Sequence, residues 1–320
     1  MGVLADIRRK LFSQNFNDEF VLIRKEYFFR LKIETVPVLV ISSLDSRTAT
    51  SGFADRLRGI ISCYAYAKAI GVPFRIEHIS PFELNDYLVP NYYDWRLQAG
   101  EKSMNLLYAN PVFFLCHEIG YHSLRFLRIC KRRQHHLFTN SDYIRDINNK
   151  YHLSYHFNEL FHELFKPSPS LDKVLDTHRA KLGTEGYISL SFRFMQLMGD
   201  FKDCKGDVLS EEEKKMLLDK TLSVVLQLYQ KEKKKILVTS DSQTFIDKVI
   251  QYPFVYVAPG KIGHIGYSQG ADVYEKMFVD FLLISQAEHV YMAFSGKMYR
   301  SNFAKTAALS MGAPYDEIRY

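Results

Sequence analysis

The chain of 320 residues is about twice the length of a typical domain, which predicts two domains or one large α/β unit. A hydrophobic content of 47% with 24% charged residues excludes a disordered protein. The four cysteines lack a CxxC spacing, so they indicate neither a zinc site nor a disulfide framework. Without a long uncharged apolar stretch or a signal-like start, we expect a cytoplasmic protein.

The net charge of +6 is densest in two basic runs, residues 125–136 and 231–235. Such runs are most often solvated surface. The alternatives are a peripheral contact with an anionic membrane, with nucleic acid or with a phosphorylated ligand. No nucleic-acid-binding motif accompanies the runs, so we expect no nucleic-acid partner.

The first part of the chain has a strand–helix–strand pattern. Residues 35–42 form an apolar run typical of a buried strand, a helical spacing of apolar residues follows Gly52, and residues 71–79 predict a second strand. This order favours a parallel sheet covered by helices. Residues 81–166 are irregular to helical and aromatic, and the prolines of "KPSPSL" that follow indicate a domain boundary.

The second part alternates short strands with helices. The expected strands are residues 187–193, 235–241, 254–258 and 289–294, and the expected helices are residues 211–230, 242–250, 271–285 and 299–311. This alternation predicts a doubly wound α/β domain of the nucleotide-binding type. We therefore place the domains at residues 1–166 and 167–320.

Polar residues follow three of these expected strands, at the edge of the sheet where such domains bind ligands. They are Arg193; Ser240 and Asp241; and Phe294, Ser295, Gly296 and Lys297. An arginine can bind a diphosphate, an aspartate can accept from a base or ribose, and a Ser-Gly helix start can bind phosphate. Each has a structural alternative, which for the aspartate is capping of the next helix. Because three such polar segments occur at equivalent strand ends, they favour a site for a phosphorylated nucleoside.

Several other motif-like segments give little support for a function. "HEIGYH" at residues 117–122 has the spacing HExxxH, so its histidines would not share a helix face as a metalloprotease requires. "HFNELFHEL" at residues 156–164 predicts one amphipathic helix. GxGxxG and P-loop motifs do not occur, nor does the Asp-x-Asp that metal-dependent glycosyltransferases usually need. We expect neither a metal site nor a cofactor.

Four segments resemble, in chain order, the fucosyltransferase-like glycosyltransferases, the superfamily of nodulation fucosyltransferases, α1,6-fucosyltransferases and protein O-fucosyltransferases. "GFADRLRGIISCYAYAKAIG" resembles their GxGNRLR segment, "YISLSFRFMQLMGDF" their HxR strand, "ILVTSDS" their ATDD strand, and residues 279–313 their DxxxLSxAD and SSFSR segment. The chain departs from the pattern at Ser191, where the family commonly has His, and at Ala54, which replaces a glycine.

The resemblance implies a GT-B architecture, with two Rossmann-like domains facing a cleft. The acceptor side would be residues 1–166, and residues 167–320 would bind the nucleotide sugar. It also implies a metal-independent, inverting transfer, typically from GDP-fucose, to a glycan or glycolipid hydroxyl. Alternatives from other classes are a non-catalytic glycan- or nucleotide-binding relative and another phosphate-donor transferase such as a sulfotransferase, against which the lack of a P-loop argues.

The resemblance also implies roles for individual residues. Arg193, after an expected strand of the second domain, would contact the diphosphate. Asp55 falls where some members have the proposed general base, although it could instead cap the helix. Arg58 would face the donor, and we expect Arg56 to be plain surface. The aromatic residues 85–96 either stack on an acceptor sugar or pack in the core.

Overall fold

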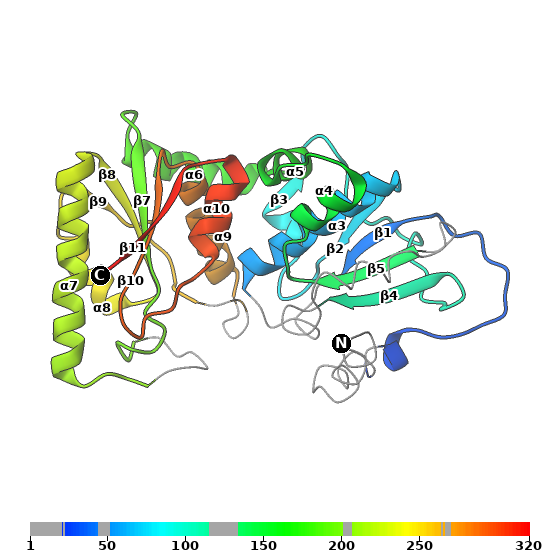
Figure 1. Ribbon diagram of the computed structural model, residues 1–320, viewed down its shortest axis with the longest axis horizontal. Helices are drawn as coiled ribbons and strands as arrows, with labels where there is room; N and C mark the ends of the chain where they lie inside the picture. The colour runs from blue at the N-terminus through cyan, green and yellow to red at the C-terminus, as the bar shows by residue number, and fades with distance from the viewer. Residues whose placement is uncertain are drawn as a thin grey trace. The chain divides into compact units, whose positions relative to one another are not determined.

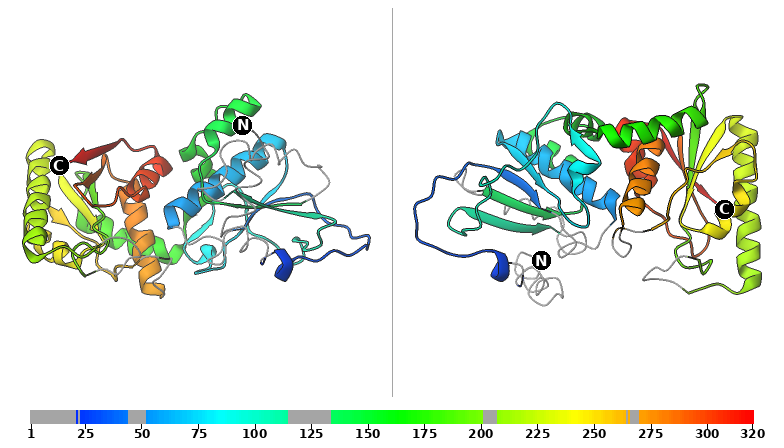
Figure 2. Two further views of the ribbon diagram at one scale, coloured as in Figure 1. Left: turned by 60° about the horizontal axis from the view of Figure 1, so that its bottom comes forward. Right: turned by 180° about the vertical axis from the view of Figure 1, so that it is seen from behind.

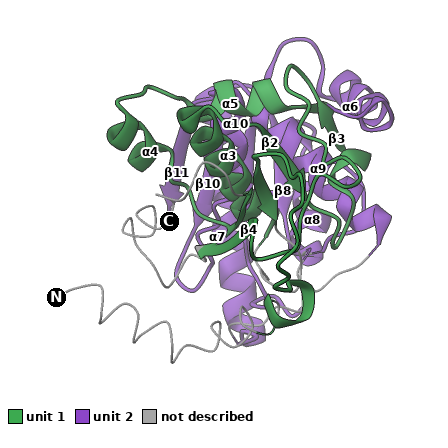
Figure 3. Cartoon of the chain, turned by 90° about the vertical axis from the view of Figure 1, so that its right-hand side faces the viewer, with its two compact units in different colours: residues 1–166 green, residues 167–320 purple. Residues whose placement is uncertain are grey.

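The computed structural model describes residues 21, 23–43, 52–114, 134–200, 207–263, 265 and 270–320. The chain divides into two compact units, residues 1–166 (unit 1) and residues 167–320 (unit 2), which are coloured separately in Figure 3. The motif at residues 117–122 lies outside the described residues. Each unit, in the part described, is built on its own parallel sheet.

Unit 1 contains a four-stranded parallel sheet in the order β2-β1-β5-β4 (Figure 1). Its strands are β1 (Val40–Ser43), β2 (Phe74–Glu77), β4 (Ala109–Phe114) and β5 (Gln134–Thr139). The first strand was expected at residues 35–42 but begins at Val40. Pro37 lies before the strand, where its missing N–H does not interrupt the ladder.

Helix α3 (Phe53–Ile70) covers the sheet of unit 1 and ends at Gly71, whose φ of +66° is left-handed. Gly59 lies where the helix crosses the end of β5. A Cβ atom there would overlap the carbonyl oxygen of Thr139. The close approach of α3 to the sheet therefore requires glycine at this position.

The remaining elements of unit 1 lie in the aromatic region that begins at residue 81. They are the short 3-10 helix η1 (Leu84–Asp86), β3 (Leu88–Pro90), α4 (Ile144–Tyr151), α5 (Phe157–Leu164) and β6 (Phe165–Pro167), which pairs with β3. Helix α5 buries its four apolar residues and leaves Glu159 and His162 exposed, so the predicted amphipathic helix is confirmed.

The described end of the first basic run is not surface. Gln134, His135 and His136 are 0%, 3% and 0% exposed within β5. Burial lowers the pKa of His136 to about 3, so its ring is neutral and can be buried without a charge. The expectation of a solvated face is therefore wrong for these three residues.

Unit 2 contains a five-stranded parallel sheet in the order β11-β10-β7-β8-β9 among its described residues. The strands are β7 (Tyr187–Phe192), β8 (Lys235–Ser240), β9 (Val255–Tyr256), β10 (Val290–Phe294) and β11 (Tyr315–Arg319). The helices are α6 (Pro169–Leu182), α7 (Glu211–Glu232), α8 (Gln243–Val249), α9 (Ala271–Ser285) and α10 (Phe303–Met311).

Helices cover both faces of this sheet, with α7 on one face and α9 and α10 on the other (Figures 1 and 2). Ile188, Leu190 and Phe192 of β7 pack in the same apolar cluster as Val225 of α7. A strand buried on both faces reads as a short apolar run, which is why the sequence located it. The predicted alternation of strands and helices in this part of the chain is confirmed.

Three features of unit 2 differ from the expectation. Helix α6 was not predicted, because the prolines that mark the boundary also begin a helix, with Ser168 as N-cap and Pro169 at its first position. Strand β11 was missed because it is an edge strand in which three of the five residues are charged, so it is not an apolar run. Helix α10 begins at Phe303 and not at Tyr299.

Candidate functional site

The three central strands of the unit 2 sheet end beside one another. Phe192 of β7 pairs with Ser240 of β8 on one side and with Ala293 of β10 on the other. The residues that follow these strands are therefore brought to one edge of the sheet. They are Arg193; Asp241; and Ser295, Gly296 and Lys297. The carboxyl edge of a parallel sheet is where α/β proteins bind ligands.

Arg193 and Asp241 form an ion pair at this edge, with 3.2 Å between Nε and Oδ2. The carboxylate also accepts hydrogen bonds from the backbone N–H groups of Phe194 and Met195, each at 2.7 Å. Burial raises the pKa of Asp241, and the charge of Arg193 and these N–H groups oppose that shift. The arginine side chain keeps 18% of its surface exposed.

Asp241 therefore fixes the turn that carries Arg193. Met195 has a φ of +57°, which is costly for a residue other than glycine. The N–H of Met195 donates to the carboxylate of Asp241, so this one carboxylate holds both the left-handed Met195 and the side chain of Arg193. Such local strain is typical of functional sites.

The helix-capping alternative for Asp241 is wrong. Ser242 is the N-cap of α8 and accepts from the N–H of Phe245. Asp200 supports this cap, since its carboxylate accepts from Ser242 Oγ at 2.9 Å and from Thr244 N at 2.6 Å. Ser240, on the other side of Asp241, accepts a hydrogen bond from Ser242 N at 3.1 Å.

The segment after β10 forms a turn instead of a helix start. Met298 N donates to Ser295 O at 2.9 Å, and Gly296 adopts a φ of +52°. The N–H groups of Gly296 and Lys297 therefore do not lie at a helix N-terminus, because α10 starts only at Phe303. Phe294 is half-buried, whereas Gly296 and Lys297 are exposed. Tyr299 N donates to Arg193 O at 3.0 Å, which ties this turn to β7.

In unit 1, Asp55 and Arg58 form an ion pair with each other in the first turn of α3. The N-cap of the helix is Gly52, with no side-chain capping bond, so the capping alternative for Asp55 is not what the structure contains. The side chains of Asp55 and Arg58 are 36% and 23% exposed.

Arg56 is completely buried, so the expectation that it is plain surface is wrong. Its Nη1 donates to the carbonyl oxygen of Ser80 at 3.0 Å. The helix start is buried on more than one side, because Phe53, Ala54 and Leu57 are also buried. A guanidinium can occupy such a position because backbone carbonyls accept its hydrogen bonds.

The aromatic residues 85–96 serve mainly the core of unit 1. Trp95 is 3% exposed and its Nε1 donates to Leu164 O at 2.8 Å. The hydroxyl of Tyr93 bonds to the backbone of Phe74, whereas Tyr92 is 76% exposed. Trp95 also lines a cavity, which neither periodicity nor a motif indicated.

Among the described residues, no group of three or more His, Cys, Asp or Glu side chains is arranged to hold a metal ion. No described helix combines the length and apolar character needed to cross a bilayer.

Two units with parallel sheets, one of which gathers a basic side chain and a glycine turn at its carboxyl edge, define an α/β protein with the GT-B type of fold. Solved structures to which this chain is similar include fucosyltransferases. Arabidopsis thaliana FUT1, a mutant in complex with GDP, aligns with a TM-score of 0.59 and 13% identity over 98% of this chain and 78% of its own.

Two structures of NodZ give similar values. NodZ α-1,6-fucosyltransferase soaked with GDP-fucose aligns with a TM-score of 0.52 and 13% identity over 86% of this chain and 92% of its own. NodZ from Bradyrhizobium aligns with a TM-score of 0.51 and 14% identity over 85% and 92%. No protein-family model and no curated protein matches the sequence. The fold that the resemblance implied is thus confirmed.

Proposed function

We propose that this chain is a metal-independent, inverting glycosyltransferase that transfers fucose from GDP-fucose to a hydroxyl of a glycan. The observation that carries the proposal is Arg193, presented by Asp241 at the carboxyl end of β7 beside the Ser295–Lys297 turn. The GDP and GDP-fucose complexes of structures with the same fold support a nucleotide sugar as the donor.

In this proposal, Arg193 stabilises the diphosphate as the bond to the sugar breaks. New negative charge then develops on the leaving phosphate. A cation at ~4 Å in an effective dielectric of ~20 interacts with it by about 4 kcal/mol before desolvation. Arginine also matches two phosphate oxygens at once, which lysine cannot do. The roles of Ser240, Phe294, Ser295, Gly296 and Lys297 would be to hold the rest of the donor.

Asp55 would act as the general base that takes the proton of the acceptor hydroxyl. Its Oδ1 is held by Arg58, which orients the carboxylate from the same helix turn. General-base assistance contributes about 10²- to 10⁴-fold to a rate. Arg58 would contribute a second positive charge toward the donor.

We extend the proposal to a glycan or glycolipid acceptor and to a cytoplasmic enzyme in peripheral contact with anionic membrane. Exposed lysines support the membrane contact: the side chains of Lys231 and Lys234 are 69% and 37% exposed, although each is paired with one glutamate, Glu232 and Glu288 respectively. Basic surface of this kind attracts anionic lipid headgroups.

A thermal-shift panel of GDP, UDP, CDP, ADP and adenosine 3′,5′-bisphosphate tests the donor site. At 100 times its Kd, a ligand raises folding stability by about 2.7 kcal/mol. We expect GDP alone to shift the melting temperature, Arg193→Ala to abolish the shift and Arg193→Lys to reduce it. The matched control is Arg179→Ala on α6, whose arginine also pairs with carboxylates. A GDP shift unchanged by Arg193→Ala contradicts the proposal, as does stabilisation by the bisphosphate alone.

A further inference from the structure

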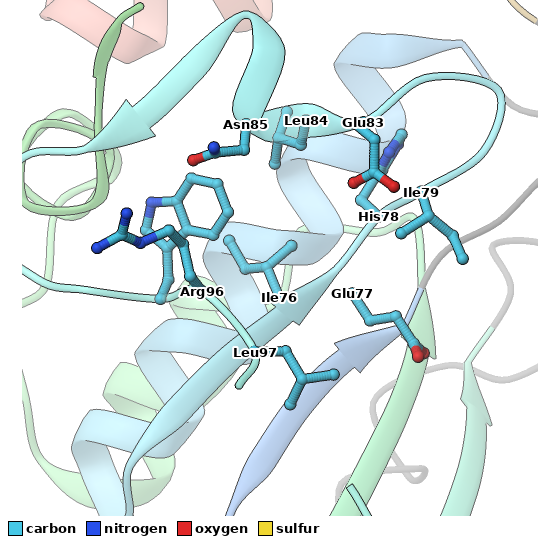
Figure 4. Close-up of a pocket in the computed structure, with 10 residues that line it drawn as sticks. Ile76, Glu77, His78, Ile79, Glu83, Leu84, Asn85, Arg96 and Leu97 are labelled. Atoms are coloured by element: carbon cyan, nitrogen blue, oxygen red, sulfur yellow. The ribbon is translucent and has the colours of Figure 1, made fainter. Parts of the chain in front are cut away.

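Unit 1 contains a cavity of about 320 Å³ at the carboxyl end of β2 (Figure 4). Its lining comes from β2, from the segment around η1 and from residues 95–97. The volume lies at the lower end of the ~300–1,000 Å³ range of small-molecule sites. The carboxyl end of a parallel strand is also the edge at which such folds bind ligands.

The cavity has an apolar floor and a polar rim. Ile76, Leu84 and Trp95 are 4%, 2% and 3% exposed and form apolar lining. In Figure 4, Glu83 and Glu77 lie on one side of the cavity and Asn85 lies on the other. A sugar ring is complementary to such a lining. Its C–H faces pack on apolar and aromatic groups, and its hydroxyls form hydrogen bonds with carboxylates and amides.

The wall of the cavity is fixed before any ligand binds. The Oε2 of Glu77 accepts from Ser43 Oγ at 2.8 Å and from Lys102 Nζ at 2.6 Å. The Nε1 of Trp95 is anchored on Leu164 O at 2.8 Å. A pre-organised wall lowers the entropic cost of binding.

The charges on the rim favour some sugars over others. Arg96 is paired with Asp94 through Nε and Nη2, both at 2.8 Å, and Glu77 is paired with Lys102. Among the described residues, Glu83 has no ion-pair partner within 4.0 Å, so the rim carries an excess negative charge there. A carboxylate accepts from hydroxyl or ammonium groups and repels the carboxylate of an acidic sugar.

The cavity is connected to the start of α3. The loop that forms its wall continues from Ile79 to Ser80, whose carbonyl oxygen accepts from Arg56 Nη1 at 3.0 Å. Arg56 follows Asp55 directly on α3. The cavity wall and the helix turn that carries the proposed base are therefore joined by a hydrogen bond from a buried arginine.

We propose that this cavity is a saccharide subsite that binds a neutral or amino-bearing sugar ring and disfavours an acidic one. As the place where the acceptor is held, it rests on the proposed function. Glu83 determines the charge preference, and Leu97 closes one side of the space that the ring occupies.

Ligand-observed saturation-transfer NMR on the full chain tests the subsite, with the methyl glycosides of N-acetylglucosamine, glucosamine and glucuronic acid as probes. We expect the first two to bind and the glucuronide to bind about tenfold more weakly, because one like-charge contact is of that order. Glu83→Lys should remove or reverse this preference. Leu97→Trp should fill the space and weaken all three probes at least about fivefold.

The matched control is Glu159→Lys, which makes the same charge change at an exposed position of α5 and should leave all three affinities unchanged. Circular dichroism identifies any variant that fails to fold, and Glu83→Gln then replaces Glu83→Lys. Absence of binding by every probe, or binding that Leu97→Trp and the Glu83 variants leave unchanged, overturns the subsite. If no probe binds but GDP still raises the melting temperature, the subsite is wrong and the proposed function stands. If GDP no longer raises the melting temperature but the sugar preference remains, the proposed function is wrong and the saccharide subsite stands.

Discussion

Arg193→Ala removes the cation that faces the buried carboxylate of Asp241. At the 3.2 Å separation and an effective dielectric of ~20, their attraction is about 5 kcal/mol. Removing one partner of a buried pair costs ~3–5 kcal/mol. The two backbone N–H donors of Phe194 and Met195 remain on the carboxylate. We therefore expect the free energy of unfolding of unit 2 to fall by about 3 kcal/mol at neutral pH.

The loss should depend on pH in a defined direction. Burial already raises the pKa of Asp241, and Arg193 opposes that shift, so the pKa rises further in Arg193→Ala. A carboxyl whose pKa is higher in the folded state takes up a proton on folding. The folded state therefore gains stability as the pH falls through the folded pKa, and this gain is complete below the unfolded value. The destabilisation should therefore shrink as the pH falls from neutral toward the ordinary pKa of an aspartate, ~3.9.

Urea unfolding of wild type, Arg193→Ala, Asp241→Asn and the double variant measures this effect. The chain has a single tryptophan, Trp95, which lies in unit 1, so its fluorescence is an internal control and circular dichroism reports both units. We expect a coupling energy between the two positions at the upper end of the ~0.5–3 kcal/mol range for residues in contact. A penalty that does not change with pH, or a coupling energy near zero, would refute the reasoning.

Two further outcomes follow from unit 1. Asp55→Asn should slow fucosyl transfer by about 10²- to 10⁴-fold while a GDP-induced thermal shift persists, because in the proposed function Asp55 contacts the acceptor and not the donor. A rate within about twofold of wild type would exclude the base role. Gly59→Ala should destabilise unit 1 by at least about 1–3 kcal/mol, because its Cβ would overlap Thr139 O. Unfolding is followed by Trp95 fluorescence, with Ala65→Gly in the same helix as the comparison. An unchanged unfolding midpoint for Gly59→Ala would contradict the close packing of α3 on β5.

The alternation of strands and helices in unit 2 could be predicted because each central strand is buried on both faces and therefore reads as an apolar run. The same pattern indicated that Arg193, Asp241 and the segment after β10 follow neighbouring strands. It could not indicate that the carboxylate of Asp241 accepts from the N–H groups of Phe194 and Met195. That contact depends on the turn after β7, which has no sequence signature because its left-handed residue is a methionine.

Unit 1 was less predictable for a different reason. The burial of Arg56 depends on a carbonyl oxygen 24 residues away in sequence, at Ser80, and helical spacing contains no information about such a partner. The cavity beside Trp95 combines residues from β2, from η1 and from residues 95–97, none of which forms a recognisable motif. The late start of α10 was not signalled by a capping motif, because its N-cap Asn302 makes no side-chain capping bond and Ser301 Oγ accepts from Phe303 N in the turn before the helix.

The parallel order β10-β7-β8 has a consequence for folding. Arg193 and Ser295 come from positions about a hundred residues apart, and loop closure of that length is slow compared with local helix formation. The edge that holds both residues exists only once β10 has docked beside β7. A nascent chain that ends before β10 would contain Arg193 and Asp241 but not the complete edge. A ligand of this edge would therefore bind only chains in which the unit 2 sheet has fully formed.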